Sequence, residues 1–167
     1  MERFEVAQQI QKLAALAGAE LLEAYGVDSV PAKGGWVEND ELLYSGVMGF
    51  YGETLSGTCL LAAPAATVLA AAPRDARPRD WVGELTNQLV GRLKSKLLAR
   101  GVTIAMTTPV VLSGVRISPL PRGDMEPAVF ETSTGRALVW LEFEATSAFR
   151  FGSERPIAGT EGDLLVF

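Results

Sequence analysis

Apolar residues recur at helical spacing in two long stretches of the chain. The first stretch covers residues 2–25 and ends at Gly26. The second starts at Pro78 and ends at Gly101, with no further proline between them. Proline favours the first turn of a helix and glycine favours its end, so this stretch predicts one helix of about six turns. Its apolar stripe consists of Val82, Leu85, Leu89, Leu93 and Leu97.

Segments rich in β-forming residues lie between and after these helices. Leu42–Tyr51 and Leu55–Ala63 predict a hairpin that turns at residues 52–54. A short helix is predicted to open at Pro64 and to continue to about Ala72. Further strands are predicted at residues 102–106, 110–117, 128–132, 137–145 and 164–167. The remaining segments carry five of the nine prolines. Residues 27–40 are predicted to be a loop or an irregular edge segment, and residues 118–127 and 150–162 are predicted loops.

This order of elements predicts an α+β fold. We expect a largely antiparallel sheet, with a long N-terminal helix and a long central helix packed on one side of it. The glycines at positions 46, 49 and 57 interrupt the predicted hairpin and indicate bulges or tight packing. A chain of 167 residues is most simply one domain, spanning residues 1–167.

The central helix carries an unusual polar face opposite its apolar stripe. Asp80, Glu84, Asn87 and Gly91 fall within a sector of about 40°. Such a face can be an ordinary solvated surface, or it can act on another protein. A carboxylate at position 84 can accept a charge-assisted hydrogen bond from a partner's Lys or Arg. The amide of Asn87 offers a donor and an acceptor that can orient a water molecule, and Gly91 leaves a flat surface for docking.

Composition removes most other catalytic systems. The sequence has no histidine, which excludes Ser-His and Cys-His nucleophiles and zinc sites that contain histidine. Cys59 is the only cysteine and lies in an apolar run, so we expect a small buried hydrophobic residue there. Asp80 and Glu84, one helical turn apart, are expected to be two ordinary ionised acids rather than a hydrolase pair.

Charge and hydropathy suggest where the protein acts. The net charge of −5 argues against nucleic acid as a partner, because binding phosphates requires a basic surface. The longest apolar run, residues 59–72, is shorter than the roughly 20 residues of a membrane span. The N-terminus has acids where a signal peptide has bases. We therefore expect a cytoplasmic protein that does not bind membranes.

The pattern Asp80-x3-Glu84-x2-Asn87-x3-Gly91 resembles the signature helix of the CheC/CheX family of chemotaxis phosphatases. The hairpin sequence at residues 45–61 is similar to the glycine-bearing hairpin of that family. The T-P-x-V-x-x-G sequence at residues 108–114 is similar to the strand that follows the family's signature helix. The later hairpin at Gly135 also fits, so the resemblance covers residues 43–145.

The resemblance implies a phosphatase that removes the phosphoryl group from the aspartate of a CheY-like response regulator. In this family the motif helix enters the active site of the regulator. By analogy, Asn87 orients the attacking water and Glu84 pairs with the active-site lysine of the regulator. Asp80 and Gly91 are then supporting or partner-binding residues. The resemblance implies no cofactor of the protein's own, because the Mg²⁺ ion belongs to the regulator.

The single copy of the motif is similar to the CheX-type arrangement, whose members dimerise through their sheets. A homodimer in a chemotaxis or other two-component signalling pathway is therefore expected. The basic connector at residues 73–79 and the tail after Arg150 depart from the family pattern. The alternatives are a non-catalytic binding module of the same fold, docking to a signalling or flagellar-switch protein, and an unrelated α+β domain.

Overall fold

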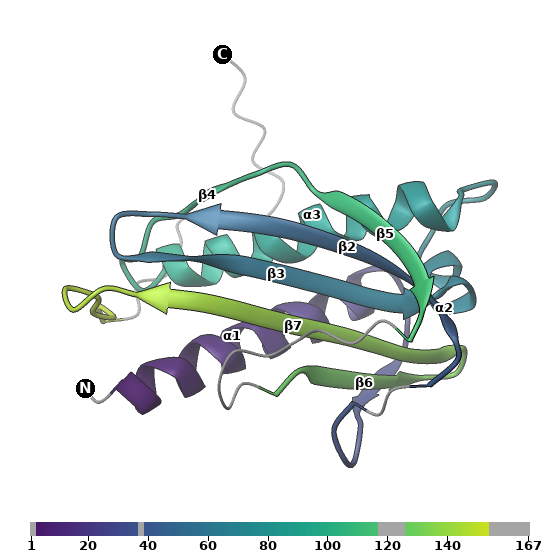
Figure 1. Ribbon diagram of the computed structural model, residues 1–167, viewed down its shortest axis with the longest axis horizontal. Helices are drawn as coiled ribbons and strands as arrows, with labels where there is room; N and C mark the ends of the chain where they lie inside the picture. Colours follow the sequence, from purple (N-terminus) through teal and green to yellow (C-terminus); the bar gives the residue numbers. More distant parts are fainter. Residues whose placement is uncertain (1–2, 37–38, 117–125, 154–167) are drawn as a thin grey trace.

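The computed structural model describes residues 3–36, 39–116 and 126–153 (Figure 1). Both predicted long helices are present, and their ends match the glycine signals: Gly26 and Gly101 have φ angles of 73° and 76°. The helices are α1 (Arg3–Ala24), α2 (Ala65–Ala70) and α3 (Pro78–Leu98). The strands are β1 (Ser29–Pro31), β2 (Leu42–Tyr51), β3 (Leu55–Pro64), β4 (Ala105–Met106), β5 (Val110–Val115), β6 (Ala128–Thr132) and β7 (Gly135–Ala145).

The strands form one antiparallel sheet, which confirms the predicted α+β fold. Its order is β1-β6-β7-β3-β2, and both β4 and β5 then pair with β2. Strands β4 and β5 are therefore two pieces of one edge, interrupted at residues 107–109. Both long helices lie on the same side of the sheet, as Figure 1 shows. No helix within the described ranges is long and apolar enough to cross a membrane.

The main core fills the space between the sheet and the two long helices. The whole apolar stripe predicted for α3 is buried there: Val82, Leu85, Leu89, Leu93 and Leu97. Cys59 is fully buried in the same core, which confirms its role as a small hydrophobic residue. Burial raises the pKa of the Cys59 thiol to about 12, because the apolar surroundings disfavour the thiolate.

A smaller apolar cluster covers the opposite face of the sheet. Leu43 and Leu138 are almost fully buried in it, at 1% and 0% exposure. Trp36 packs against this cluster and so attaches the segment after β1 to the sheet. The sheet is therefore covered on both faces near β6 and β7.

The predicted strands differ from the observed ones in two places. Strand β1 lies inside residues 27–40, which were predicted to be a loop or an irregular edge segment, and it pairs with β6 at the edge of the sheet. The predicted strand at residues 102–106 is reduced to β4, because Val102 and Ile104 turn their side chains into the core before the chain joins β2. The predicted final strand at residues 164–167, most of the loop at 118–127 and most of the loop at 150–162 lie outside the described residues.

The sequence predicts bulges or tight packing at the glycines of the hairpin, and the structure confirms tight packing. A Cβ at position 46, 49 or 57 would lie 3.2 Å or less from a neighbouring heavy atom. Gly46 matters most for α3, because its missing Cβ would overlap the Thr86 hydroxyl and lie 2.7 Å from Thr86 Cβ. The Thr86 hydroxyl is fully buried there and donates to the Val82 carbonyl at 2.7 Å. Gly46 thus allows the backbone of α3 to approach β2 closely.

We expect Gly46→Ala to destabilise the protein by about 1–3 kcal/mol, because the added methyl group overpacks the contact with α3. Chemical denaturation measures this loss. Gly91→Ala is the matched control, since a Cβ there meets nothing within 4 Å and alanine is the better helix former. The control should unfold at the same or a higher denaturant concentration. Equal stability of Gly46→Ala and the wild type would show that the close approach is not required.

Candidate functional site

Three of the four residues predicted for the site line one groove. Asp80, Glu84 and Asn87 project from α3 on one side of it. The other side is the interrupted sheet edge, residues 107–109, with Val111 of β5. The groove has a volume of about 560 Å³ and is open to solvent. Gly91, the fourth predicted residue, does not line it.

Glu84 and Asn87 are both half-buried, whereas Asp80 is exposed. The Oε1 atom of Glu84 accepts a hydrogen bond of 2.9 Å from Nε2 of Gln88. Among the described residues, the amide of Asn87 has no hydrogen-bond partner. Gln88 therefore holds the carboxylate in place, while the Asn87 amide keeps both its donor and its acceptor for another molecule.

Gln88 was not predicted to take part in the site. Its i, i+4 spacing from Glu84 is the signal that could have identified it, since such pairs face each other on a helix. The pair also leaves the second carboxylate oxygen of Glu84 without a hydrogen bond among the described residues. That oxygen can accept from a cation supplied by another protein.

Asp80 lies in the first turn of α3, two residues after Pro78. A carboxylate there interacts favourably with the partial positive charge of the helix N-terminus, by about 0.3–1 kcal/mol. The N-cap residue, Arg77, makes no side-chain capping hydrogen bond. The carboxylate of Asp80 therefore stabilises the start of α3 whether or not a partner is bound, and it also borders the groove.

The far wall of the groove is fixed by Thr107, which joins β4 to β5. Its backbone N–H donates to the Gly49 carbonyl at 2.9 Å, and its hydroxyl accepts from the Gly49 N–H at 2.9 Å. The hydroxyl also donates to the Thr108 carbonyl at 3.2 Å. A threonine side chain therefore replaces a backbone carbonyl in the ladder, and this holds Thr108 and Pro109 opposite α3.

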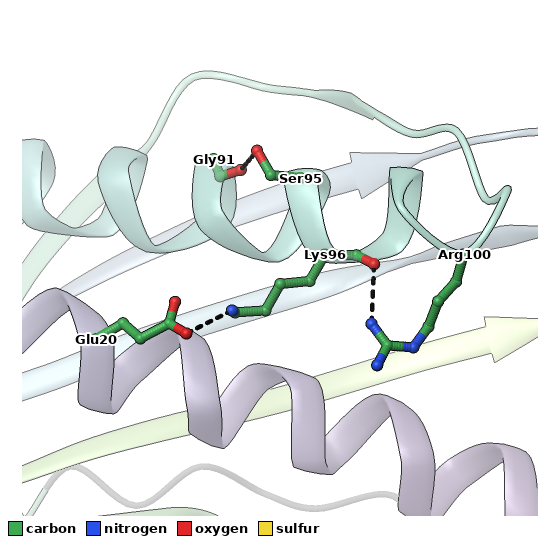
Figure 2. Close-up of polar contacts among 5 residues, drawn as sticks. All are labelled: Glu20, Gly91, Ser95, Lys96 and Arg100. Atoms are coloured by element: carbon green, nitrogen blue, oxygen red, sulfur yellow. Dashed lines mark hydrogen bonds and ion pairs between the residues drawn. The ribbon is translucent and has the colours of Figure 1, made fainter. Parts of the chain in front are cut away.

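Gly91 lies further along α3, on an open part of the helix. Figure 2 shows its carbonyl accepting a hydrogen bond of 3.1 Å from the Ser95 hydroxyl, on the side away from α1. On the side toward α1, Lys96 Nζ forms an ion pair of 2.7 Å with Glu20 Oε1. The helix is thus attached to α1 through one face and leaves the surface at Gly91 uncovered.

The charged and amide groups that line the groove are the carboxylates of Asp80 and Glu84, the amide of Asn87 and the guanidinium of Arg79. No cluster of three or more Cys, Asp or Glu side chains suited to a metal ion occurs within the described ranges. Neither Glu84 nor Asn87 is a nucleophile activated by a base. The arrangement is suited to binding a cation with Glu84 and positioning a small polar molecule with Asn87, on a group that another molecule brings.

Comparisons with known proteins give the family context of this groove. The sequence model of the family described as Chemotaxis phosphatase CheX matches residues 44–133, which include most of β2 and all of β3, α3 and β5. Among curated proteins, none matches the chain significantly.

Several solved structures share the fold. The chemotaxis protein CheX from Vibrio vulnificus is 22% identical, with a TM-score of 0.66 over 81% of this chain and 96% of its own. A putative chemotaxis protein from Desulfovibrio vulgaris Hildenborough is 23% identical, with a TM-score of 0.65 over 81% of this chain and 97% of its own. The CheX-CheY-BeF3-Mg²⁺ complex from Borrelia burgdorferi contains a chain that is 17% identical, with a TM-score of 0.55 over 80% of this chain and 97% of its own.

At these identities the structures show the common fold. The family match carries the assignment, because it covers more than half of the chain and includes the helix that bears Asp80, Glu84, Asn87 and Gly91. The chain belongs to the CheX family of chemotaxis phosphatases.

Proposed function

We propose that this protein dephosphorylates the phosphoaspartate of a CheY-like response regulator. The observation that carries the proposal is the pair Glu84 and Asn87, held half-buried on one helix in an open groove, with the Asn87 amide unpaired among the described residues. Membership of the CheX family supports the reaction class. The Borrelia burgdorferi relative is a CheX-CheY complex, which supports the class of partner.

In the proposed reaction, α3 docks with its groove over the active site of the regulator. The Asn87 amide accepts a hydrogen bond from a water molecule and orients it in line with the aspartyl-phosphate bond. Glu84 accepts a charge-assisted hydrogen bond from the active-site lysine of the regulator. The Mg²⁺ ion is bound by the regulator, as part of the phosphorylated substrate. Water attacks phosphorus, the phosphorus–oxygen bond to the aspartate breaks, and inorganic phosphate leaves.

Positioning is sufficient for such a reaction. Phosphoryl transfer needs little covalent chemistry from the protein that assists it, and placing the attacking oxygen accounts for a large part of the barrier reduction. The rigid attachment of α3 fits this demand. Gly46 sets its distance from the sheet, and Lys96 with Glu20 ties it to α1. A side chain on such a helix can hold a water molecule within the tolerance that in-line attack requires.

Asn87→Ala should lower kcat for phosphate release by about 10²-fold, because the attacking water loses its positioning group. The measurement follows loss of phosphate from cognate CheY-like regulators phosphorylated with acetyl phosphate. Glu84→Gln should instead weaken docking, seen as a higher KM, since it removes the negative charge that faces the lysine.

Asn39→Ala is the matched control for this series, because Asn39 is the only other asparagine and does not line the groove. It should leave turnover unchanged. Full activity of Asn87→Ala would overturn the assignment of Asn87. Wild-type protein that binds the regulators without accelerating phosphate loss would favour a non-catalytic docking module of the same fold.

Gly91 is proposed to keep the docking surface of α3 flat. Gly91→Leu adds a side chain where a Cβ meets nothing within 4 Å, so the fold should tolerate it. We expect the thermal midpoint to stay unchanged or rise while affinity for the regulator falls. Titration by isothermal calorimetry, with Ser95→Leu on the exposed turn that follows as a comparison, measures the effect. Unchanged affinity in Gly91→Leu would remove Gly91 from the docking surface.

We also propose that the protein is a homodimer that joins two sheets at β5. The outer edge of β5 pairs with no other strand of the described chain. Val110 and Leu112 are 59% and 51% exposed on the face opposite the groove, because successive side chains of a strand alternate between faces. Docking at the groove and pairing at β5 are therefore compatible. An open apolar edge strand is a ready template for another strand.

A mass measurement in solution tests the dimer. Light scattering at micromolar concentration should give twice the 17.8 kDa of one chain. Replacing Val110 and Leu112 by lysine should return the value for one chain, since charges on an edge strand oppose strand pairing. A single-chain mass for the wild type would contradict the proposal.

A further inference from the structure

The groove contains one cation that the proposed reaction does not use. Arg79 lines it together with Asp80, Glu84 and Asn87, and its side chain is exposed. Among the described residues, Arg79 forms no ion pair or hydrogen bond with these carboxylates or with any other side chain. Its guanidinium is therefore unneutralised at the edge of the proposed catalytic groove.

The spacing on α3 places Arg79 and Asn87 on one stripe of the helix. They are eight residues apart, so their Cα atoms are separated by about 12 Å along the helix axis. The position between them, one turn from each, is Gly83. Because Gly83 has no side chain, nothing on the helix stands between the guanidinium and the amide.

Gly83 is itself part of the groove lining. Gly83 is buried because Val111 of β5 lies against it, and a Cβ at position 83 would be 3.1 Å from Val111 Cγ2. The floor of the groove is thus a backbone segment and an apolar side chain. Between Arg79 and Asn87 on that stripe, the groove is therefore bordered on α3 by backbone alone.

The exposed guanidinium of Arg79 attracts a negatively charged group. Asp80 and Glu84 border the groove, and both repel an acidic surface that approaches it. A regulator that presents a phosphorylated aspartate has such an acidic surface. An arginine can offset this repulsion and bind two phosphoryl oxygens with its planar fork of donors, which a lysine cannot do.

We propose that Arg79 binds the phosphoryl group of the docked regulator and so makes the protein prefer the phosphorylated partner. This inference rests on the proposed function. Arg79 donates to the non-bridging phosphoryl oxygens, while Asn87 holds the water on the opposite side of the phosphorus atom. Arg79 takes part in no bond making or breaking. It holds the negatively charged phosphoryl oxygens while the phosphoryl group is transferred from the aspartate to water.

The experiment compares Arg79→Ala and Arg79→Lys with Arg74→Ala. Arg74 is exposed in the connector before α3 and lies outside the groove, so its replacement removes the same charge without touching the site. Affinity is measured for one CheY-like regulator in two forms, untreated and treated with BeF₃⁻ and Mg²⁺ to mimic phosphorylation. Phosphate release is measured in parallel with the acetyl phosphate-treated regulator.

Arg79→Ala should lose about tenfold or more in affinity for the BeF₃⁻-treated form, and KM should rise accordingly, because charge-assisted hydrogen bonds are lost. Affinity for the untreated form should stay unchanged. Arg79→Lys should recover part of the loss, and Arg74→Ala should behave as the wild type.

Two results would overturn the role of Arg79. One is wild-type affinity for the BeF₃⁻-treated form in Arg79→Ala. The other is an equal loss for both forms, which would mark Arg79 as a general contact. These binding readouts do not require turnover. If the wild type prefers the treated form but releases no phosphate, the proposed catalysis fails, while the Arg79 comparison still decides its own question.

Discussion

The close contact between α3 and β2 at Gly46 is the constraint on which the rest of the site depends. A helix normally packs on a sheet at a distance set by the side chains between them. Here Gly46 of β2 has no Cβ, and Thr86 of α3 occupies the space. This contact sets the height of α3 above the sheet. The groove exists because Val111 and residues 107–109, one strand further out, then stand beside the helix. If α3 were lifted by the thickness of a methyl group, Glu84 and Asn87 would lose the wall opposite them.

The proposed reaction divides its chemistry between two proteins. The groove holds an amide that can position water, a carboxylate that can bind a cation, and at its edge a guanidinium that has no partner among the described residues. None of these groups is an activated nucleophile, and in the proposed reaction none needs to be. In that proposal the phosphoryl group, the metal ion and the lysine belong to the regulator. What this chain contributes is rigid placement, supported by the ion pair between α1 and α3 and by the Glu84–Gln88 hydrogen bond.

The sequence predicts those features that depend on neighbours in the chain. The stripe of α3 and the hairpin of β2 and β3 follow from local periodicity and match the structure closely. Strand β1 was missed because three residues ending in Pro31 carry no periodic pattern, and it exists only through pairing with β6. The groove wall at Thr107 was missed for a related reason. It depends on how β4 and β5 pair with β2, more than fifty residues earlier, and on a side-chain hydroxyl that completes the ladder at Gly49.

The buried thiol of Cys59 has a practical consequence for following the docking of this protein. Its pKa of about 12 and its complete burial leave almost no thiolate at neutral pH, so maleimide and iodoacetamide reagents should not reach it in the folded state. The folded natural chain is therefore expected not to react with thiol labels. A cysteine introduced on the exposed side of α3 can carry the only dye or spin label on the molecule, without replacing the native residue in the core.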